Sequence, residues 1–207
     1  MRFGPAFAGE GLSGSVFVNW FKGEAFMDPT EVLEKEHDVI QVVLNAADEE
    51  IGFINDEAAV RTGRLDLMLE FFANFTYRCH HAKEEEHLFP ALEEHGMSRE
   101  TGLIAGLLQE HEQGHQLVDE IDAATTGAGQ GEEEQLLEVR DGLRSYVELI
   151  REHIRKENEN LYPQARKLLN SEEMDALTRA FATVEREEMG VGVHERYHAI
   201  AHQLTEE

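Results

Sequence analysis

One eleven-residue pattern occurs twice in the sequence, and this repeat constrains the fold more than any other feature. Residues 80–90 and residues 153–163 both read H-x-x-K-E-x-E-x-L-[F/Y]-P, at an offset of 73 residues. A Glu-His pair stands ahead of each copy, with His37 lying 43 residues before the first and His111 lying 42 residues before the second. A match of this length indicates an internal duplication. The chain is therefore expected to contain two similar helical hairpins.

Apolar residues at helical spacing predict four long helices, and no alternating β-branched runs are seen. The first begins at the capping sequence Asp28-Pro29-Thr30-Glu31 and runs to the mid-fifties; the others span about 65–94, from 98 to the early 120s, and 132–169. The glycine-rich segment 125–131 has the composition of a flexible loop. Short connections favour an all-α, up-down-up-down four-helix bundle.

The predicted domain organisation has three parts. Residues 1–27 are rich in glycine and aromatic residues and are expected to form an irregular N-terminal arm. Residues 28–170 form the bundle. Residues 171–207 form a C-terminal helical appendage packed on the bundle, with one helix ending near Gly190 and a second over about 191–204.

The repeat places metal-binding side chains on the predicted helix faces. Residues four apart share one face of an α-helix, so His80 can reach the same point as Glu84, and His153 the same point as Glu157. Burying these groups without partners would cost several kcal/mol, which metal ions would remove. Carboxylates that bridge two metals on bundle helices favour iron or manganese. The predicted ligands in one core layer are His37, His80, Glu84, His111, His153 and Glu157.

Two further histidines leave alternatives open. His115 lies four residues after His111, where the first repeat has Gln41. If His115 binds a metal ion, that ion has three histidine ligands, and the second ion, with only His37 and His80, keeps an open coordination position. In the alternative, His115 lies beside the site as a hydrogen-bond donor and binds no metal. His81 offers a second register with Glu85, but it lies about 100° round the helix, and alignment with the second copy selects His80.

Composition excludes several classes of function. The chain has 43 Asp and Glu against 18 Lys and Arg, a net charge of −25, which argues against partners that are nucleic acids or anionic membranes. A single cysteine cannot form an internal disulfide or a cysteine-rich metal site. No apolar stretch is long enough to span a bilayer, and no secretory signal is evident, so a cytoplasmic location is expected.

The repeated E-H, H-x-x-K-E and L-[F/Y]-P elements resemble the hemerythrin-like (HHE cation-binding) proteins, which are non-haem di-iron four-helix bundles. The resemblance covers about Asp28 to Pro163. The family's oxygen carriers have the pattern H, H-x-x-x-E, H-x-x-x-H, H-x-x-x-x-D, and this chain departs at the last element, where Glu157 follows His153 by four residues and the fifth is Asn158. The resemblance implies two iron ions, oxo- or hydroxo-bridged, and a role with oxygen, nitric oxide, peroxide or iron.

Several functions stay open on the sequence. A nitrogen-rich, positively charged di-iron site favours binding dioxygen, nitric oxide or peroxide over hydroxylating hydrocarbons. The alternatives are an enzyme that turns over peroxide or nitric oxide, with no assignable catalytic residue, and an iron-responsive regulatory module. A protein partner or electron donor is compatible with each. The stripe His194, His198, His202 is expected to dock on the bundle, the alternative being a second metal site.

Overall fold

A computed structural model describes residues 28–186 and 193–206, and within these ranges the chain is all-helical, as predicted. The helices, with π-helical segments labelled η, are α1 (Pro29–Glu57), α2 (Thr62–Phe71), η1 (Phe72–His81), η2 (Glu84–Leu88), α3 (Phe89–Glu94), α4 (Gly102–Gly129), α5 (Glu133–Lys156), η3 (Glu157–Leu161), α6 (Tyr162–Leu168), α7 (Ser171–Val184) and α8 (Val193–Glu206). The predicted N-terminal arm, residues 1–27, lies outside the described residues.

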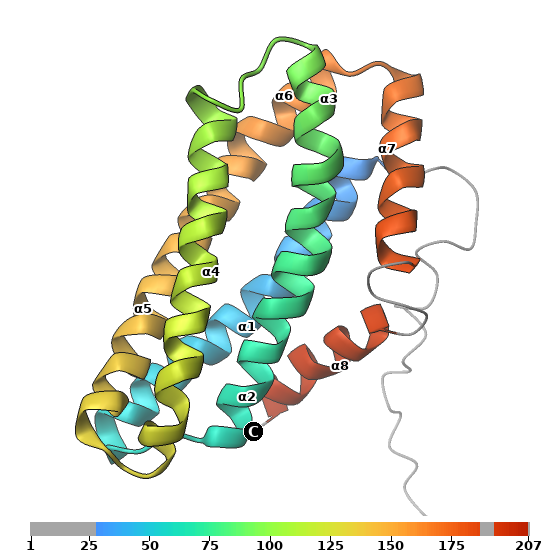
Figure 1. Ribbon diagram of the computed structural model, residues 1–207. Helices are drawn as coiled ribbons and strands as arrows, with labels where there is room; N and C mark the ends of the chain where they lie inside the picture. Colours follow the sequence, from blue (N-terminus) through green and yellow to red (C-terminus); the bar gives the residue numbers. More distant parts are fainter. Residues whose placement is uncertain (1–27, 187–192, 207) are drawn as a thin grey trace, which may run out of the picture.

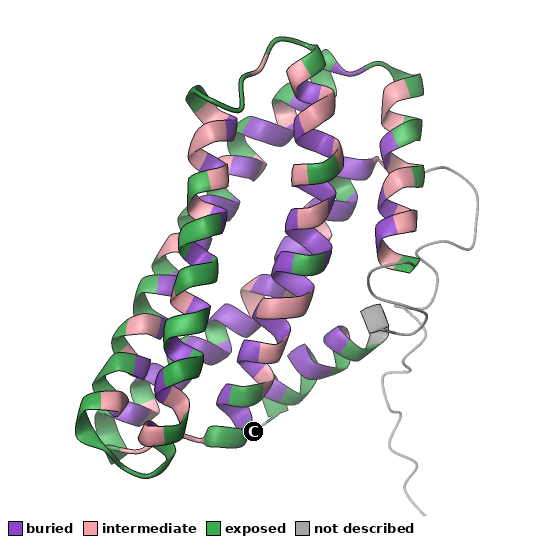
Figure 2. Ribbon diagram, viewed as in Figure 1, coloured by how far each residue is buried: buried purple, intermediate pink, exposed green. Residues whose placement is uncertain are grey.

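Four long helical stretches run alongside one another in alternating directions (Figure 1). They are α1, the run from α2 to α3, α4, and the run from α5 to α6. The stretches contact one another in a ring, because α1 packs against α5 and α2, while α4 packs against α5 and η1. Buried residues line the inward faces of all four (Figure 2).

Local sequence explains where two of the helices, α1 and α7, begin. The side chain of Asp28 caps α1 by accepting a hydrogen bond from the Thr30 amide at 2.8 Å, and Pro29 occupies the first turn, where its missing N–H costs nothing. Asn170 caps α7 in the same way, with Glu173 completing a capping box.

The two prolines of the repeat coincide with π-helical turns. Pro90 and Pro163 lie in the first turns of α3 and α6, directly after η2 and η3. A proline inside a helix removes one backbone hydrogen bond and crowds the carbonyl group four residues earlier. Widening the preceding turn relieves this crowding, and π-helical turns are frequent at functional sites. Each widened turn begins at one of the two repeated glutamates, Glu84 and Glu157.

The prediction of a loop over 125–131 is wrong for most of that segment, because α4 continues to Gly129. Ala124 and Ala128 are buried in the core and hold this last part of the helix against its neighbours. A Cβ atom on Gly127 would lie 2.7 Å from the Gln135 side chain. The small residues therefore allow close helix packing here rather than marking a loop.

The two C-terminal helices complete the core rather than extending away from it. Helix α7 packs against α1 and η2, and α8 packs against α1 and α2 (Figure 1). Leu177 and Phe181 join one apolar cluster, and Tyr197, Ile200 and Leu204 join the other. The predicted helix to Gly190 ends as an α-helix at Val184, and residues 187–192 lie outside the described residues.

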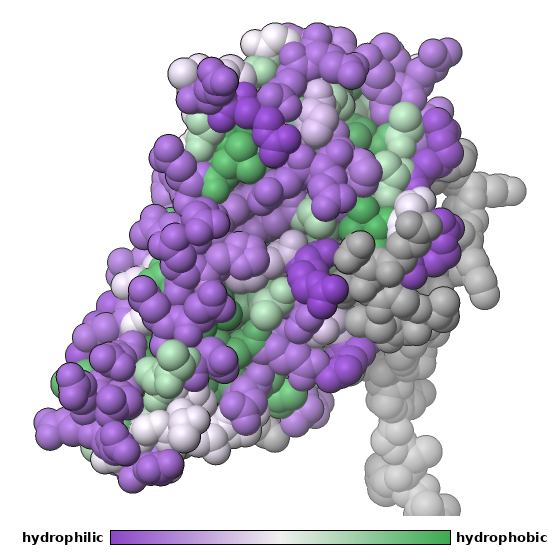
Figure 3. All heavy atoms as spheres, viewed as in Figure 1, coloured by the Kyte–Doolittle hydropathy of each residue, from purple (hydrophilic) through white to green (hydrophobic). Residues whose placement is uncertain are grey.

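On the face shown in Figure 3, hydrophilic side chains dominate, with scattered apolar residues between them. Among the described helices, none combines the length and apolarity that crossing a membrane requires.

Candidate metal centre

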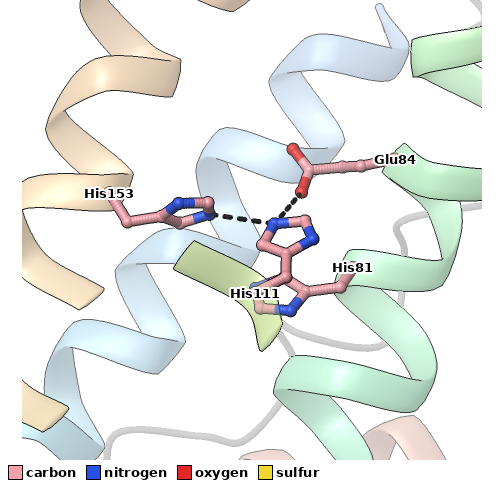
Figure 4. A group of neighbouring side chains, drawn as sticks. All are labelled: His81, Glu84, His111 and His153. Carbon is pink, nitrogen blue, oxygen red and sulfur yellow. Dashed lines mark hydrogen bonds and ion pairs between the residues drawn. The ribbon is translucent and has the colours of Figure 1, made fainter. Parts of the chain in front are cut away.

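Seven buried histidine and glutamate side chains meet between the four helical stretches. They form two groups, within each of which the potential ligand atoms lie no more than 4.8 Å apart. One group contains His37, His80 and Glu157. The other contains His81, Glu84, His111 and His153, and Figure 4 shows these four side chains converging from three helical stretches.

The three-residue group joins α1, η1 and η3. Nε2 of His37 lies 2.9 Å from Nε2 of His80 and 3.1 Å from Oε2 of Glu157. Two nitrogen ligands of one metal ion, each about 2.1 Å from it and at a right angle, would be separated by about 3 Å. The His37–His80 separation therefore matches two ligands of one ion.

The four-residue group has a similar arrangement. Nε2 of His111 lies 3.1 Å from Nε2 of His153 and 3.5 Å from Oε2 of Glu84 (Figure 4). The His81 ring stacks on the His111 ring, with centroids 3.6 Å apart and planes 7° apart. This group thus offers three imidazoles and one carboxylate.

The two glutamates connect the groups. Glu157 places Oε2 beside His37 and Oε1 3.0 Å from Nε2 of His153. Glu84 places Oε2 3.9 Å from Nε2 of His80 and 3.5 Å from that of His111. Each carboxylate therefore lies where it could bridge two metal ions.

A second layer of side chains fixes the orientation of four of the imidazoles. Each Nδ1 atom has an oxygen partner, at 2.9 Å for His37 with Asn158, 2.9 Å for His80 with Glu36, 2.6 Å for His111 with Glu85 and 3.0 Å for His153 with Glu110. Such partners direct the other ring nitrogen toward the metal and raise its basicity. All four Nε2 atoms accordingly face the centre of the site.

Charge in this outer layer is balanced by lysines. Lys83 pairs with Glu36 and Lys156 pairs with Glu110, at corresponding places in the two repeats. Burial opposes ionisation of Glu36, but Lys83 and His80 outweigh it and hold the pKa of Glu36 at about 2. Glu36 is therefore a carboxylate that can accept the proton on Nδ1 of His80.

The inner carboxylates and imidazoles perturb one another strongly. Burial opposes protonation of His153, but Glu157 and Glu110 overcome it and raise the pKa of His153 to about 10. Burial, together with the neighbouring His111 and His153, holds the pKa of His81 well below its usual value. These opposite shifts are expected where several imidazoles and carboxylates share one buried space.

Several inward-facing atoms lack hydrogen bonds, and metal ions fit this pattern. Among the described residues, Oε2 of Glu84, both carboxylate oxygens of Glu157 and Nδ1 of His81 are buried and make no hydrogen bond of good geometry, although imidazole nitrogens lie 3.0–3.5 Å from the carboxylate oxygens. Buried polar atoms are normally satisfied, and unpaired ones cost free energy. Two cations bound among nitrogen and oxygen donors would satisfy them.

The family model for the hemerythrin HHE cation-binding domain matches residues 28–165. The chain belongs to this hemerythrin family. It is also 24 % identical over 160 residues to the uncharacterized proteins Mb2018 of Mycobacterium bovis and Rv1995 of Mycobacterium tuberculosis. That match covers 77 % of this chain and 62 % of each relative, so the chain spans under two thirds of their length. No solved structure matches.

Within this hemerythrin domain, the structure brings six of the seven predicted ligands together and leaves one outside. His37, His80, Glu84, His111, His153 and Glu157 all lie in the two groups. His115 is exposed at the surface and belongs to neither; its ring stacks on Tyr77, with centroids 3.7 Å apart. Ligand binding by each of these residues stays a prediction.

His81 is the candidate ligand that sequence reasoning did not select. Because adjacent residues of a helix point about 100° apart, a single ligand group predicts that only one of His80 and His81 takes part. The structure has two ligand groups, and the adjacent histidines, at the end of η1, each enter a different one. The adjacent pair itself, with Glu following each histidine by four residues, was the available signal.

The remaining histidines whose side chains the structure describes lie outside the two groups. His95 contacts Glu173, with Nε2 3.0 Å from Oε1, and His87 is half-buried. His198 packs near Phe75 on the docked helix α8, and His202 is exposed. The side chain of His194 lies outside the described residues, so the stripe remains untested as a metal site.

Proposed function

We propose that this hemerythrin domain is an up-down-up-down four-helix bundle that holds two iron ions and binds dioxygen, nitric oxide or peroxide, for oxygen binding, sensing or scavenging. The observation that supports it is the pair of ligand groups joined by Glu84 and Glu157. Nitrogen-rich sites with bridging carboxylates on bundle helices suit a pair of iron ions. When bound, ferrous iron supplies the electrons that a diatomic ligand accepts.

The residues of the chain provide the rest of the chemistry. Four imidazoles are held by their Nδ1 partners, so the donor atoms need little reorganisation when metal enters. Phe89 is fully buried, and its ring lies 6.0 Å from that of His111, so an apolar side chain borders the site. The two groups contain five imidazoles and only two carboxylates, so the site suits an anionic small ligand better than a strongly oxidising intermediate.

A metal assay followed by an anaerobic optical titration tests the proposal. The purified full chain is loaded with ferrous iron, its metal content measured, and one equivalent of dioxygen added and then purged. We expect two irons per chain and a visible band that disappears on purging. Irreversible oxidation, or catalytic consumption of peroxide or nitric oxide, would favour the enzyme. Zinc or no metal would refute the di-iron proposal.

Matched variants connect that result to the ligands. His80→Ala and His153→Ala should each lower both iron content and thermal stability, because each removes a donor from a different group. His95→Ala removes a partly exposed histidine that belongs to neither group. It should keep two irons, and iron loss in this control as well would contradict the assignment.

A further inference from the structure

The two candidate metal positions differ in how many ligands the protein supplies. One group has four residues and the other has three, His37, His80 and Glu157. Fewer protein ligands leave more of a metal's coordination positions for a small molecule. The surroundings of the three-residue group should therefore decide which molecule binds there.

One hydroxyl group faces the three-residue group. The Tyr162 side chain is fully buried, and its ring lies nearly parallel to that of His37, with centroids 5.6 Å apart and planes 17° apart. Its hydroxyl donates a hydrogen bond to Oε1 of Glu84 at 2.8 Å and lies 3.3 Å from Nε2 of His37. A polar hydrogen is thus held at the edge of the two ligand groups.

The corresponding place at the other group has no hydroxyl. Phe89 occupies the same position of the repeat as Tyr162, and its ring lies 6.0 Å from that of His111 at 20°. The two aromatic residues therefore pack alike on equivalent histidines. They differ by one oxygen atom, and that atom is on the side with fewer protein ligands.

Resting on the function proposed above, we propose that Tyr162 is a specificity-determining residue that donates a hydrogen bond to a small anionic ligand held at the His37, His80 and Glu157 group. Peroxide and azide belong to this class, because each is a compact anion with an acceptor atom beyond the one that binds metal. The phenol has one proton, which it donates to Oε1 of Glu84 in this structure. A metal ion bound by Glu84 would compete for that carboxylate, and the hydroxyl, 3.3 Å from Nε2 of His37, could then turn and donate to the ligand instead.

Azide binding to the iron-loaded, oxidised full chain tests this role. A hydrogen bond to a charged acceptor contributes enough that Tyr162→Phe should bind azide about tenfold more weakly or worse. The variant should keep two irons per chain, because Tyr162 belongs to neither ligand group. The matched variant Phe89→Tyr adds a hydroxyl at the equivalent place and should change azide affinity by less than about twofold if the other group does not bind the anion.

A spectroscopic measurement on the unaltered protein keeps the test decisive if a variant folds poorly. The antisymmetric stretch of bound azide is recorded in H₂O and in D₂O. A frequency shift is expected, since the proton donated by Tyr162 is exchangeable, and Tyr162→Phe should abolish that shift. No shift in the unaltered protein, or unchanged azide affinity in Tyr162→Phe, would overturn the inference.

Two other results have distinct meanings. A visible band in azide-free ferric protein that disappears in Tyr162→Phe would show that the phenolate binds iron directly, and would overturn the role as hydrogen-bond donor. The metal assay comes before azide is added. If the unaltered protein fails to bind two irons in that assay, the proposed function is refuted, and this inference with it.

Discussion

The two helical hairpins, residues 29–94 and residues 102–168, carry the same inner framework in different surroundings. In each, the first helix supplies a Glu-His pair and the second supplies His, Lys and Glu at matching positions. Each glutamate of the pair bonds the histidine on the partner helix of its own hairpin, at 2.9 Å and 3.0 Å. Each first-helix histidine is instead bonded from the opposite hairpin, by Asn158 or Glu85. The framework therefore needs both halves.

The differences lie around that framework. The first hairpin has His81 and Phe89 where the second has Ile154 and Tyr162. Lys83 is fully buried and also pairs with Glu185 after α7, whereas the equivalent lysine of the second hairpin is about one-third exposed. The repeated residues therefore hold the potential donors, while the unrepeated ones make the two candidate metal positions unequal and attach the C-terminal helices.

The largest expected effect comes from making the first hairpin more like the second at His81. His81→Ile introduces the residue found at position 154 and removes one donor of the four-residue group. Loss of an outer partner typically costs 10–100-fold in metal affinity, so loss of a donor should weaken binding of one metal ion by more than about 100-fold. Competition with a coloured chelator measures the affinity.

His115→Gln is the matched control, because Gln41 stands at the equivalent place in the first hairpin. His115 is exposed and outside both groups, so two irons should remain bound. The opposite outcome, with iron lost in His115→Gln and kept in His81→Ile, would restore His115 as the fifth histidine ligand.

The next effect concerns the two outer lysines. Lys83→Met leaves the buried carboxylate of Glu36 without its cation, and breaking a buried pair in this way costs about 3–5 kcal/mol. Lys156→Met removes a partly exposed pair with Glu110, which contributes about 1 kcal/mol or less. Urea unfolding of both metal-free proteins gives the two free energies. Equal losses would show that burial does not distinguish the hairpins.

A smaller effect is expected where the hairpins differ in side-chain size. Gly114 stands where the first hairpin has Ile40, and Tyr77 stands where the second hairpin has Ile150. A glycine–tyrosine pair thus takes the place of two isoleucines. A Cβ atom on Gly114 would lie 2.7 Å from the Tyr77 hydroxyl oxygen. Gly114→Ala should therefore lower the free energy of unfolding by about 1–3 kcal/mol through overpacking.

Gly106→Ala provides the control on the same helix. No atom lies within 4 Å of a Cβ at this position, so alanine should stabilise the helix by up to about 1 kcal/mol. Thermal unfolding of both variants gives the comparison. Stabilisation by Gly114→Ala as well would mean that the Tyr77 ring moves aside at no cost.

Sequence patterns located the repeated part of this molecule and missed the unrepeated part for physical reasons. The capping residue Asp28, the helical class and the grouping of His80 with His37 follow from local spacing and duplication. Helical spacing allows only one of two adjacent histidines to face a given ligand group, so the pattern does not predict that His81 enters a second group beside that of His80. The helix through Gly127 depends on tertiary packing against Gln135, which no local composition reveals.

The smallest effect concerns the contact between Glu185, directly after α7, and Lys83; among the described residues, Lys156 has no such second carboxylate partner. Oε1 of Glu185 lies 2.7 Å from Nζ of Lys83, which also holds Glu36. Glu185→Gln keeps an acceptor there and leaves Lys83 paired with Glu36, so the loss should be about 1 kcal/mol, measured by urea unfolding. Glu172→Gln, an exposed change on α7, should be neutral. A loss as large as that of Lys83→Met would mean that Glu185, rather than Glu36, is the principal partner of the buried lysine, and that the C-terminal helix is part of the outer layer of the metal centre.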